Sequence, residues 1–123
     1  MSFAEKAVAL HGEQGFNCCQ AVACSACHKF GMDMDTGYRL GAFFGGGMRR
    51  GEVCGCVSDA LMVLGLKYGD ENNRQSMESQ HFMKAFEEKF GALPCRDLIK
   101  AHGKRLCPEL IAFAAAYLED HVL

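Results

Sequence analysis

The chain has 123 residues, of which 50 % are hydrophobic and 23 % are charged. That length is typical of one domain, and a chain this hydrophobic can bury a core, which excludes a disordered tail. The formal net charge is -2, with 13 Lys and Arg against 15 Asp and Glu, and this balance excludes the strongly basic character of a dedicated nucleic-acid binder.

Helical periodicity dominates the chain, and no segment shows the sustained alternation of a β-strand. Ser2 followed by Glu5 forms a capping-box pattern, Asn17 is an N-cap residue, and Gly31 is a stop signal. In chain order the predicted helices run from Ser2 to about Gly12–Gly15, from Asn17 to Phe30, from Asp33 to Phe44, from Val53–Gly55 to Tyr68, from Asn72 or Asn73 to Phe90, from Pro94 as a short helix, and from Cys107–Pro108 as the last one. We therefore expect an all-α fold of five to seven helices that forms a single compact domain over residues 1–123.

The segment between the third and fourth predicted helices is rich in glycine and arginine: Gly45, Gly46, Gly47, Arg49 and Arg50. Such a loop can present backbone N–H groups to an anion, and arginine can bind phosphate or carboxylate. The Gly-Lys-Ser/Thr ending of a phosphate-binding P-loop is missing. The alternative is a tight turn that lets Cys54 approach its neighbours, with the arginines solvated or paired with Glu52.

Eight cysteines are the most unusual feature of the composition. Four of them fall at predicted helix starts: Cys18, Cys54, Cys95 and Cys107. Free backbone N–H groups and the helix dipole stabilise an anion at such positions, so the pKa of a thiol there is lowered. If the four helix starts converge, these cysteines form a thiolate-rich pocket that can do redox chemistry or bind a metal.

The other four cysteines are predicted to be small buried hydrophobic side chains: Cys19, Cys24, Cys27 and Cys56. Cys56 follows Cys54 by two residues, so the two are not expected to share a helix face. Cys24-Ser25-Ala26-Cys27-His28 has the spacing of a c-type haem attachment site, but haem is the least favoured cofactor because no export signal is visible. Cys24 and Cys27 could instead form a dithiol pair, although no strand precedes them as in a thioredoxin-like motif.

The beginning of the chain shows no signal-peptide pattern, because Glu5 and Lys6 interrupt any apolar run. The longest mainly apolar segment, Ala60–Leu66, is too short to span a membrane. We expect a cytoplasmic bacterial protein, in a compartment where thiols stay reduced. Eight cysteines there favour metal binding, redox cycling or packing over a disulfide scaffold.

Three segments carry a family resemblance: Asn17-Cys18-x-Gln20-Ala21-Val22, Phe44–Met48 and the block from Gly51 to Gly69. Together they resemble the C_GCAxxG_C_C family of small redox-active cysteine proteins, over about Phe16 to Cys107. The four spaced cysteines of that family match the same four positions that begin the predicted helices. Cys56 and Asp59 stand where the family usually has small residues. The resemblance implies redox activity but no known substrate and no established cofactor.

Three functions fit these observations. In the first, Cys54 is the most activated thiolate and forms a reversible disulfide with Cys18, Cys95 or Cys107. In the second, the same four cysteines are ligands of zinc or an iron–sulfur cluster. In the third, the chain is a structural helical interaction domain with buried cysteines. We rank the redox function first, with a redox partner or a small anion as binding partner, and the sequence leaves open whether the protein is an enzyme.

The fifth predicted helix carries an aromatic stripe that ends at Phe90. Such a stripe is typical of core packing, and in a chain this hydrophobic it could also form the interface of a homodimer.

Overall fold

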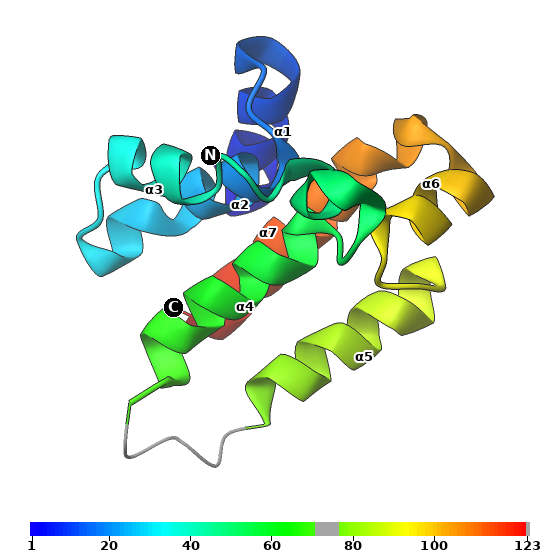
Figure 1. Cartoon of the computed structure of the whole chain (residues 1–123). Helices are drawn as coiled ribbons and strands as arrows, with labels where there is room; N and C mark the ends of the chain where they lie inside the picture. Colours follow the sequence, from blue (N-terminus) through cyan, green and yellow to red (C-terminus); the bar gives the residue numbers. More distant parts are fainter. Residues whose placement is uncertain (71–76, 123) are drawn as a thin grey trace.

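A computed structural model describes residues 1–70 and 77–122 (Figure 1). The α-helices in these residues are α1 (Phe3–Gln14), α2 (Cys18–Ala26), α3 (Met34–Leu40), α4 (Gly55–Tyr68), α5 (Glu78–Phe90), α6 (Cys95–His102) and α7 (Cys107–Val122). Shorter helical turns are η1 (Cys27–Phe30), η2 (Gly47–Gly51) and η4 (Lys104–Leu106). No strand occurs in the described residues, so the all-α prediction is confirmed. The helical segments outnumber the predicted five to seven, because several turns between the long helices are themselves helical.

The predicted capping signals at the first two helices are confirmed. Ser2 accepts a hydrogen bond from the backbone N–H of Glu5, and the Glu5 carboxylate accepts one from the N–H of Ser2, both at 3.0 Å. Asn17 makes the same reciprocal pair with Gln20 at the start of α2. These bonds satisfy N–H groups that have no partner within the helix, which is why the two helices begin where they do.

The predicted third helix is too long. It ends at Leu40, not at Phe44, because the chain turns at Gly41 to lie against α2. A Cβ atom at Gly41 would stand 2.9 Å from the backbone nitrogen of Gln20, so only glycine allows this approach. The predicted start of the next long helix at Asn72 or Asn73 lies outside the described residues, and the structure describes α5 from Glu78.

The core forms where α1, α2, α4 and α7 pack on one another. Figure 1 shows α4 lying along α7, with α5 beside α4. Phe82 and Phe86 of α5 are fully buried, and the Phe82 ring meets the Tyr117 ring of α7 edge to face at 5.0 Å. The aromatic stripe predicted in this region is therefore core within one chain, and it fixes the long helices around which the shorter segments are arranged.

Among the described helices, none combines the length and the apolar character that crossing a bilayer requires.

Candidate functional site

Four helix starts border one cavity. Cys18, Cys95 and Cys107 are the first residues of α2, α6 and α7, and Cys54 directly precedes α4. All four line a cavity of about 200 Å³, together with Cys56. Much of the remaining wall is apolar, with Leu98, Ile99, Leu106 and Leu110. The structure thus brings together the four cysteines singled out in the sequence and adds a fifth.

Three of the five sulfurs form a tight group, called the cysteine trio below: Cys18, Cys54 and Cys56. Their Sγ atoms all lie within 4.8 Å of one another. Cys54 is 3 % exposed and Cys56 is 0 % exposed, whereas Cys18 is half-buried. Cys18 is therefore the member of the trio that a molecule entering the cavity can reach.

Cys56 is buried in the core, as predicted, and it shares no helix face with Cys54, but its sulfur nevertheless lies with that of Cys54 in the trio. Cys54 has extended backbone angles (φ -52°, ψ 135°) and stands outside the helix that contains Cys56. The rule that residues two apart point to different faces applies only within a helix. The thiol at the cap can therefore turn toward the thiol in the first turn.

A pair of backbone hydrogen bonds aligns the starts of α4 and α6. The N–H of Cys54 donates to the carbonyl of Leu93 at 2.9 Å, and the N–H of Cys95 donates to the carbonyl of Glu52 at 2.6 Å. An exposed ion pair between Arg96 and Glu52 at 3.6 Å crosses the same junction. The two segments leading into these helices lie antiparallel, which is why Cys54 and Cys95 reach the same cavity although they are far apart in sequence.

The negative charge of the cysteine trio is centred on Cys18. Hydrogen bonds from the thiols of Cys54 and Cys56, and from the backbone N–H groups of Gly46 and Cys19, hold the pKa of Cys18 well below its usual range. The same hydrogen bonds to Cys18 raise the pKa of Cys54 and of Cys56, because each thiol must keep its proton to donate it. The sequence predicted Cys54 as the most activated thiolate, whereas the pKa is lowered at Cys18 and raised at Cys54.

The glycine-rich segment supplies one of these N–H donors. Gly46 and Gly47 have positive φ angles of 64° and 66°, and a Cβ atom on Gly45 would stand 2.7 Å from the side chain of Asn17. The chain therefore folds back tightly and brings the Gly46 N–H to Cys18. The expected tight turn is present, and the hydrogen bond from its Gly46 N–H lowers the pKa of the Cys18 thiol.

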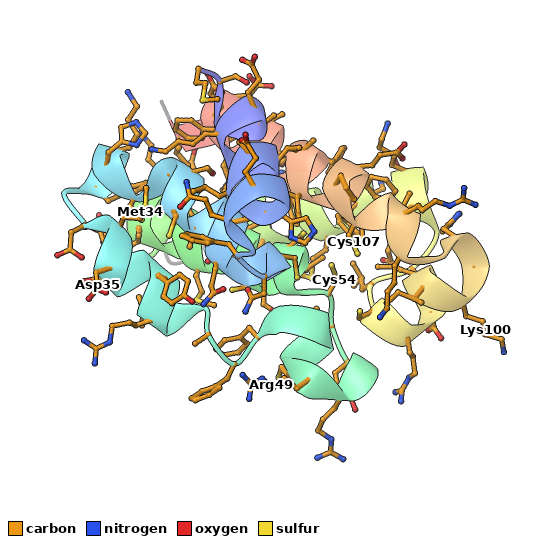
Figure 2. The ribbon with its side chains drawn as sticks, turned by 90° about the horizontal axis from the view of Figure 1, so that it is seen from above. Met34, Asp35, Arg49, Cys54, Lys100 and Cys107 are labelled. Atoms are coloured by element: carbon orange, nitrogen blue, oxygen red, sulfur yellow. The ribbon has the colours of Figure 1, made fainter. Side chains whose placement is uncertain are left out.

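The two arginines of this segment lie away from the cavity. Both are exposed, and the Arg49 guanidinium lies over the Phe43 ring, 4.9 Å from its centroid. Figure 2 shows Arg49 at the edge of the molecule, whereas Cys54 and Cys107 lie close together near the middle of the view. The predicted pairing of Glu52 with Arg49 or Arg50 is wrong, because Arg96 reaches the Glu52 carboxylate from the first turn of α6.

Two basic residues line the cavity, His11 and Lys104. The His11 ring is held by a hydrogen bond from Nδ1 to the carbonyl of Phe16 at 2.8 Å. Burial raises the pKa of both Cys95 and Cys107, and the Lys104 charge partly opposes this effect. The sequence analysis missed His11, and no local signal near this histidine points to the cavity.

The other cysteines lie outside this cavity and are buried, as predicted. Cys19 is 0 % exposed and its thiol donates to Oδ1 of Asp59 at 3.7 Å. Cys24 and Cys27 lie near the end of α2 and face α3. The cysteine trio is thus distinct from a second, separate group of sulfurs.

The trio can do two kinds of chemistry. A thiolate next to two thiols can form a disulfide with one of them, and three close sulfurs can also bind a soft metal ion.

Comparison with known proteins gives one match. A family model described as "Putative redox-active protein (C_GCAxxG_C_C)" matches residues 16–121. The match spans the cysteine trio, the glycine-rich segment and both other cavity cysteines. Searches of the curated proteins and of the solved structures found no match.

Proposed function

The chain belongs to the C_GCAxxG_C_C family, and on that premise we propose that it carries out reversible thiol–disulfide exchange with the Cys18 thiolate as nucleophile. The observation that carries this proposal is the cysteine trio: a half-buried thiolate at a helix start, within 4.8 Å of two thiols that donate to it. Cys18 takes the role that the sequence assigned to Cys54, and Cys54 or Cys56 takes the role of the partner.

The exchange needs a disulfide, RSSR, as its oxidising substrate. The Cys18 thiolate attacks one sulfur of RSSR, the S–S bond breaks, and RS⁻ leaves as a Cys18–S–S–R mixed disulfide forms. The thiol of Cys54 or Cys56 then loses its proton and attacks Sγ of Cys18, which releases the second RS⁻ and closes a disulfide within the trio. The resolving thiol supplies one proton and solvent supplies the other, so that the Cys18 thiolate, one thiol, one RSSR and one H⁺ give the disulfide of the trio and two RSH.

The wall of the cavity suits this sequence of steps. The apolar side chains beside the sulfurs limit hydration, and hydrogen bonds to a thiolate are stronger where water is excluded. Cys95 and Cys107 have raised pKa values, so they remain thiols at neutral pH and do not compete as first nucleophiles.

The proposal predicts the identity of one disulfide. We expect anaerobic titration of the reduced protein with bis(2-hydroxyethyl) disulfide, a small linear disulfide, to remove two thiols per chain. Differential alkylation and tandem mass spectrometry should place Cys18 in the new bond, and the Cys54→Ser and Cys56→Ser variants should show which thiol resolves the mixed disulfide. A product in which Cys18 stays free would contradict the proposal.

Metal binding is the second candidate function, and the mutual distances within the trio favour it. Zinc prefers four tetrahedral ligands and accepts thiolates. Cys18, Cys54 and Cys56 would supply three ligands, and Cys95 or Cys107 on the cavity wall could supply the fourth. This set replaces one of the four ligands predicted from the sequence by Cys56.

Zinc titration separates the two functions. If the trio is a metal site, we expect the reduced protein to take one equivalent of zinc from a chromophoric chelator, with release of protons as the thiols ionise. The Cys56→Ser variant should bind zinc more weakly, because the substitution removes a ligand. Zinc uptake that is unchanged in this variant would rule out the trio as the ligand set.

A further inference from the structure

A second pair of thiols lies outside the cavity of the cysteine trio. Cys24 is 1 % exposed and Cys27 is 6 % exposed. With both thiols protonated, Cys24 donates to the carbonyl of Met34 at 3.4 Å and Cys27 donates to the carbonyl of Ala23 at 3.1 Å. Cys24 lies in the last turn of α2 and Cys27 follows it by three residues at the start of η1, a spacing that puts both on one side of the helix.

Both sulfurs face a single point on α3. A Cβ atom on Gly37 would stand 2.6 Å from Sγ of Cys27 and 3.3 Å from Sγ of Cys24. The absence of a side chain at Gly37 is what leaves room for two thiols side by side between α2 and α3.

A buried carboxyl group lies beside this pair. Asp59 of α4 is 3 % exposed, and its Oδ1 accepts the hydrogen bond from Cys19. Its Oδ2 is buried and has no hydrogen-bond partner in the described part of the chain, which is costly for a polar atom in the core. Asp59 and Cys27 both line a small cavity of about 40 Å³, whose other walls include Phe30, Met32, Leu40 and Val63.

The size of this cavity selects a small reactant. One water molecule needs at least about 10–15 Å³ of such space, so 40 Å³ holds a molecule with two or three heavy atoms. Hydrogen peroxide fits within it, and an organic disulfide does not. Asp59 is the carboxylic acid among the residues that line it.

We propose that Cys24, Cys27 and Asp59 form a second redox site, at which hydrogen peroxide oxidises the two thiols to a disulfide. This site does not depend on the function proposed for the cysteine trio, because it uses other sulfurs, another cavity and another oxidant.

The chemistry balances with peroxide as the only oxidant. The Cys27 thiolate attacks one peroxide oxygen, the O–O bond breaks, and the leaving hydroxide takes the proton of the Asp59 carboxyl group to become water. Cys27 is then a sulfenic acid, and the Cys24 sulfur attacks it. The S–O bond breaks, and the second hydroxide leaves with the Cys24 proton as water. Asp59 regains from solvent the proton that Cys27 first released, so two thiols and one H₂O₂ give one disulfide and two waters.

The surrounding groups favour these protonation states. A hydrogen bond from the Cys24 thiol, together with the charge of Lys6 on α1, holds the pKa of Cys27 below its usual value, although burial and the charge of Asp33 act against this. Burial raises the pKa of Asp59 well above its usual range, which favours the protonated, neutral form of this carboxyl group. The ionised Cys27 sulfur accepts the Cys24 proton in a hydrogen bond, which replaces the bond from Cys24 to Met34.

The test uses the full chain in a Cys18→Ser background, which removes the first nucleophile of the trio. We expect stoichiometric hydrogen peroxide to form a Cys24–Cys27 disulfide, located by differential alkylation and tandem mass spectrometry of the tryptic peptide Ala7–Lys29. Adding Cys24→Ser should stop the reaction at a sulfenic acid on Cys27 that dimedone traps. Adding Cys95→Ser, a control at a cysteine of the other cavity, should leave the disulfide in place.

The carboxyl group has its own test. Asp59→Asn keeps the shape of the side chain but removes its acidic proton, and we expect the peroxide reaction to slow by about 100-fold, the lower end of what a positioned acid contributes. The fall in the peroxide reaction rate that deprotonation of Asp59 causes as the pH rises should be absent in this variant. If Asp59 were merely structural, its replacement would leave that pH dependence in place. Free thiols at both Cys24 and Cys27 after peroxide treatment, in a chain whose circular dichroism shows it folded, would overturn the proposal.

Discussion

The Cys18→Ser variant is expected to lose the disulfide of the cysteine trio completely and to lose the fastest thiol reaction of the protein. Hydrogen bonds from Cys54, Cys56 and the Gly46 N–H hold the pKa of Cys18 well below its usual range, and below that of Cys27, the other cysteine whose pKa is lowered. At pH 5 a thiol with the ordinary pKa of about 8.5 is a thiolate in roughly 3 of 10,000 molecules. If Cys18 is fully ionised at pH 5, its thiolate concentration exceeds that of an ordinary thiol by the inverse of this fraction.

Part of this gain is offset by weaker nucleophilicity, which falls with thiol pKa with a slope of about 0.4–0.5. The net advantage of wild type over the variant at pH 5 should be about tenfold in the rate of alkylation by iodoacetamide. The advantage should disappear as the pH rises toward 9, where the other thiols also ionise. Stopped-flow or quenched alkylation over pH 4–9 measures both the rate advantage at pH 5 and its loss toward pH 9.

Cys107→Ser is the matched control for this variant. Cys107 also begins a helix and lines the same cavity, but burial raises its pKa. Its replacement should leave the alkylation rate at pH 5 and the disulfide of the trio unchanged. Equal rates for wild type and Cys18→Ser at pH 5 would show that the activated sulfur lies elsewhere.

The Gly55→Ala variant should destabilise the fold and displace Cys18. A Cβ atom on Gly55 would stand 2.6 Å from Sγ of Cys18 and 2.9 Å from the carbonyl oxygen of Phe44. Rotation of the short Cys18 side chain could move its sulfur, but the Phe44 oxygen belongs to the backbone, so the loop before α4 must shift. We expect a loss of about 2–3 kcal/mol in the free energy of unfolding, the upper part of the range for overpacking a buried site.

The Gly65→Ala variant on the same helix should instead raise the free energy of unfolding. No atom lies within 4 Å of a Cβ built at Gly65, and alanine is favoured over glycine within a helix by about 1 kcal/mol. Urea unfolding of both variants should therefore move the midpoint in opposite directions. If Gly55→Ala were as stable as wild type and kept the fast alkylation at pH 5, the close approach of α4 to Cys18 would be refuted.

Local signals in the sequence predicted most helix starts, and the reason is physical. The cap of a helix is a hydrogen bond between residues three apart, as at Ser2 and Asn17, so the chain needs no distant contact to make it. Because four cysteines stand at such starts, the sequence alone placed Cys18, Cys54, Cys95 and Cys107 at helix N-termini. The expected lowering of the pKa holds for Cys18, but the pKa of each of the other three is raised. It also predicted the all-α class and the family.

The helix ends and the position of the activated sulfur required contacts between segments distant in sequence. The third helix ends at Leu40 because Gly41 meets the backbone of α2. Cys56 joins the trio because Cys54 stands outside α4, which no spacing rule shows. The thiolate is at Cys18 because two thiols of another segment and the N–H of Gly46 all donate to it.

The sequence by itself therefore determined which cysteines begin helices, since caps and stops act within one turn of the chain. Only the tertiary structure decided which sulfurs lie close together, which of them has a lowered pKa, and that Asp59 and Cys27 line one small cavity. Those properties depend on desolvation and on hydrogen bonds between packed segments, and both come into being only when α2, α3 and α4 are in place.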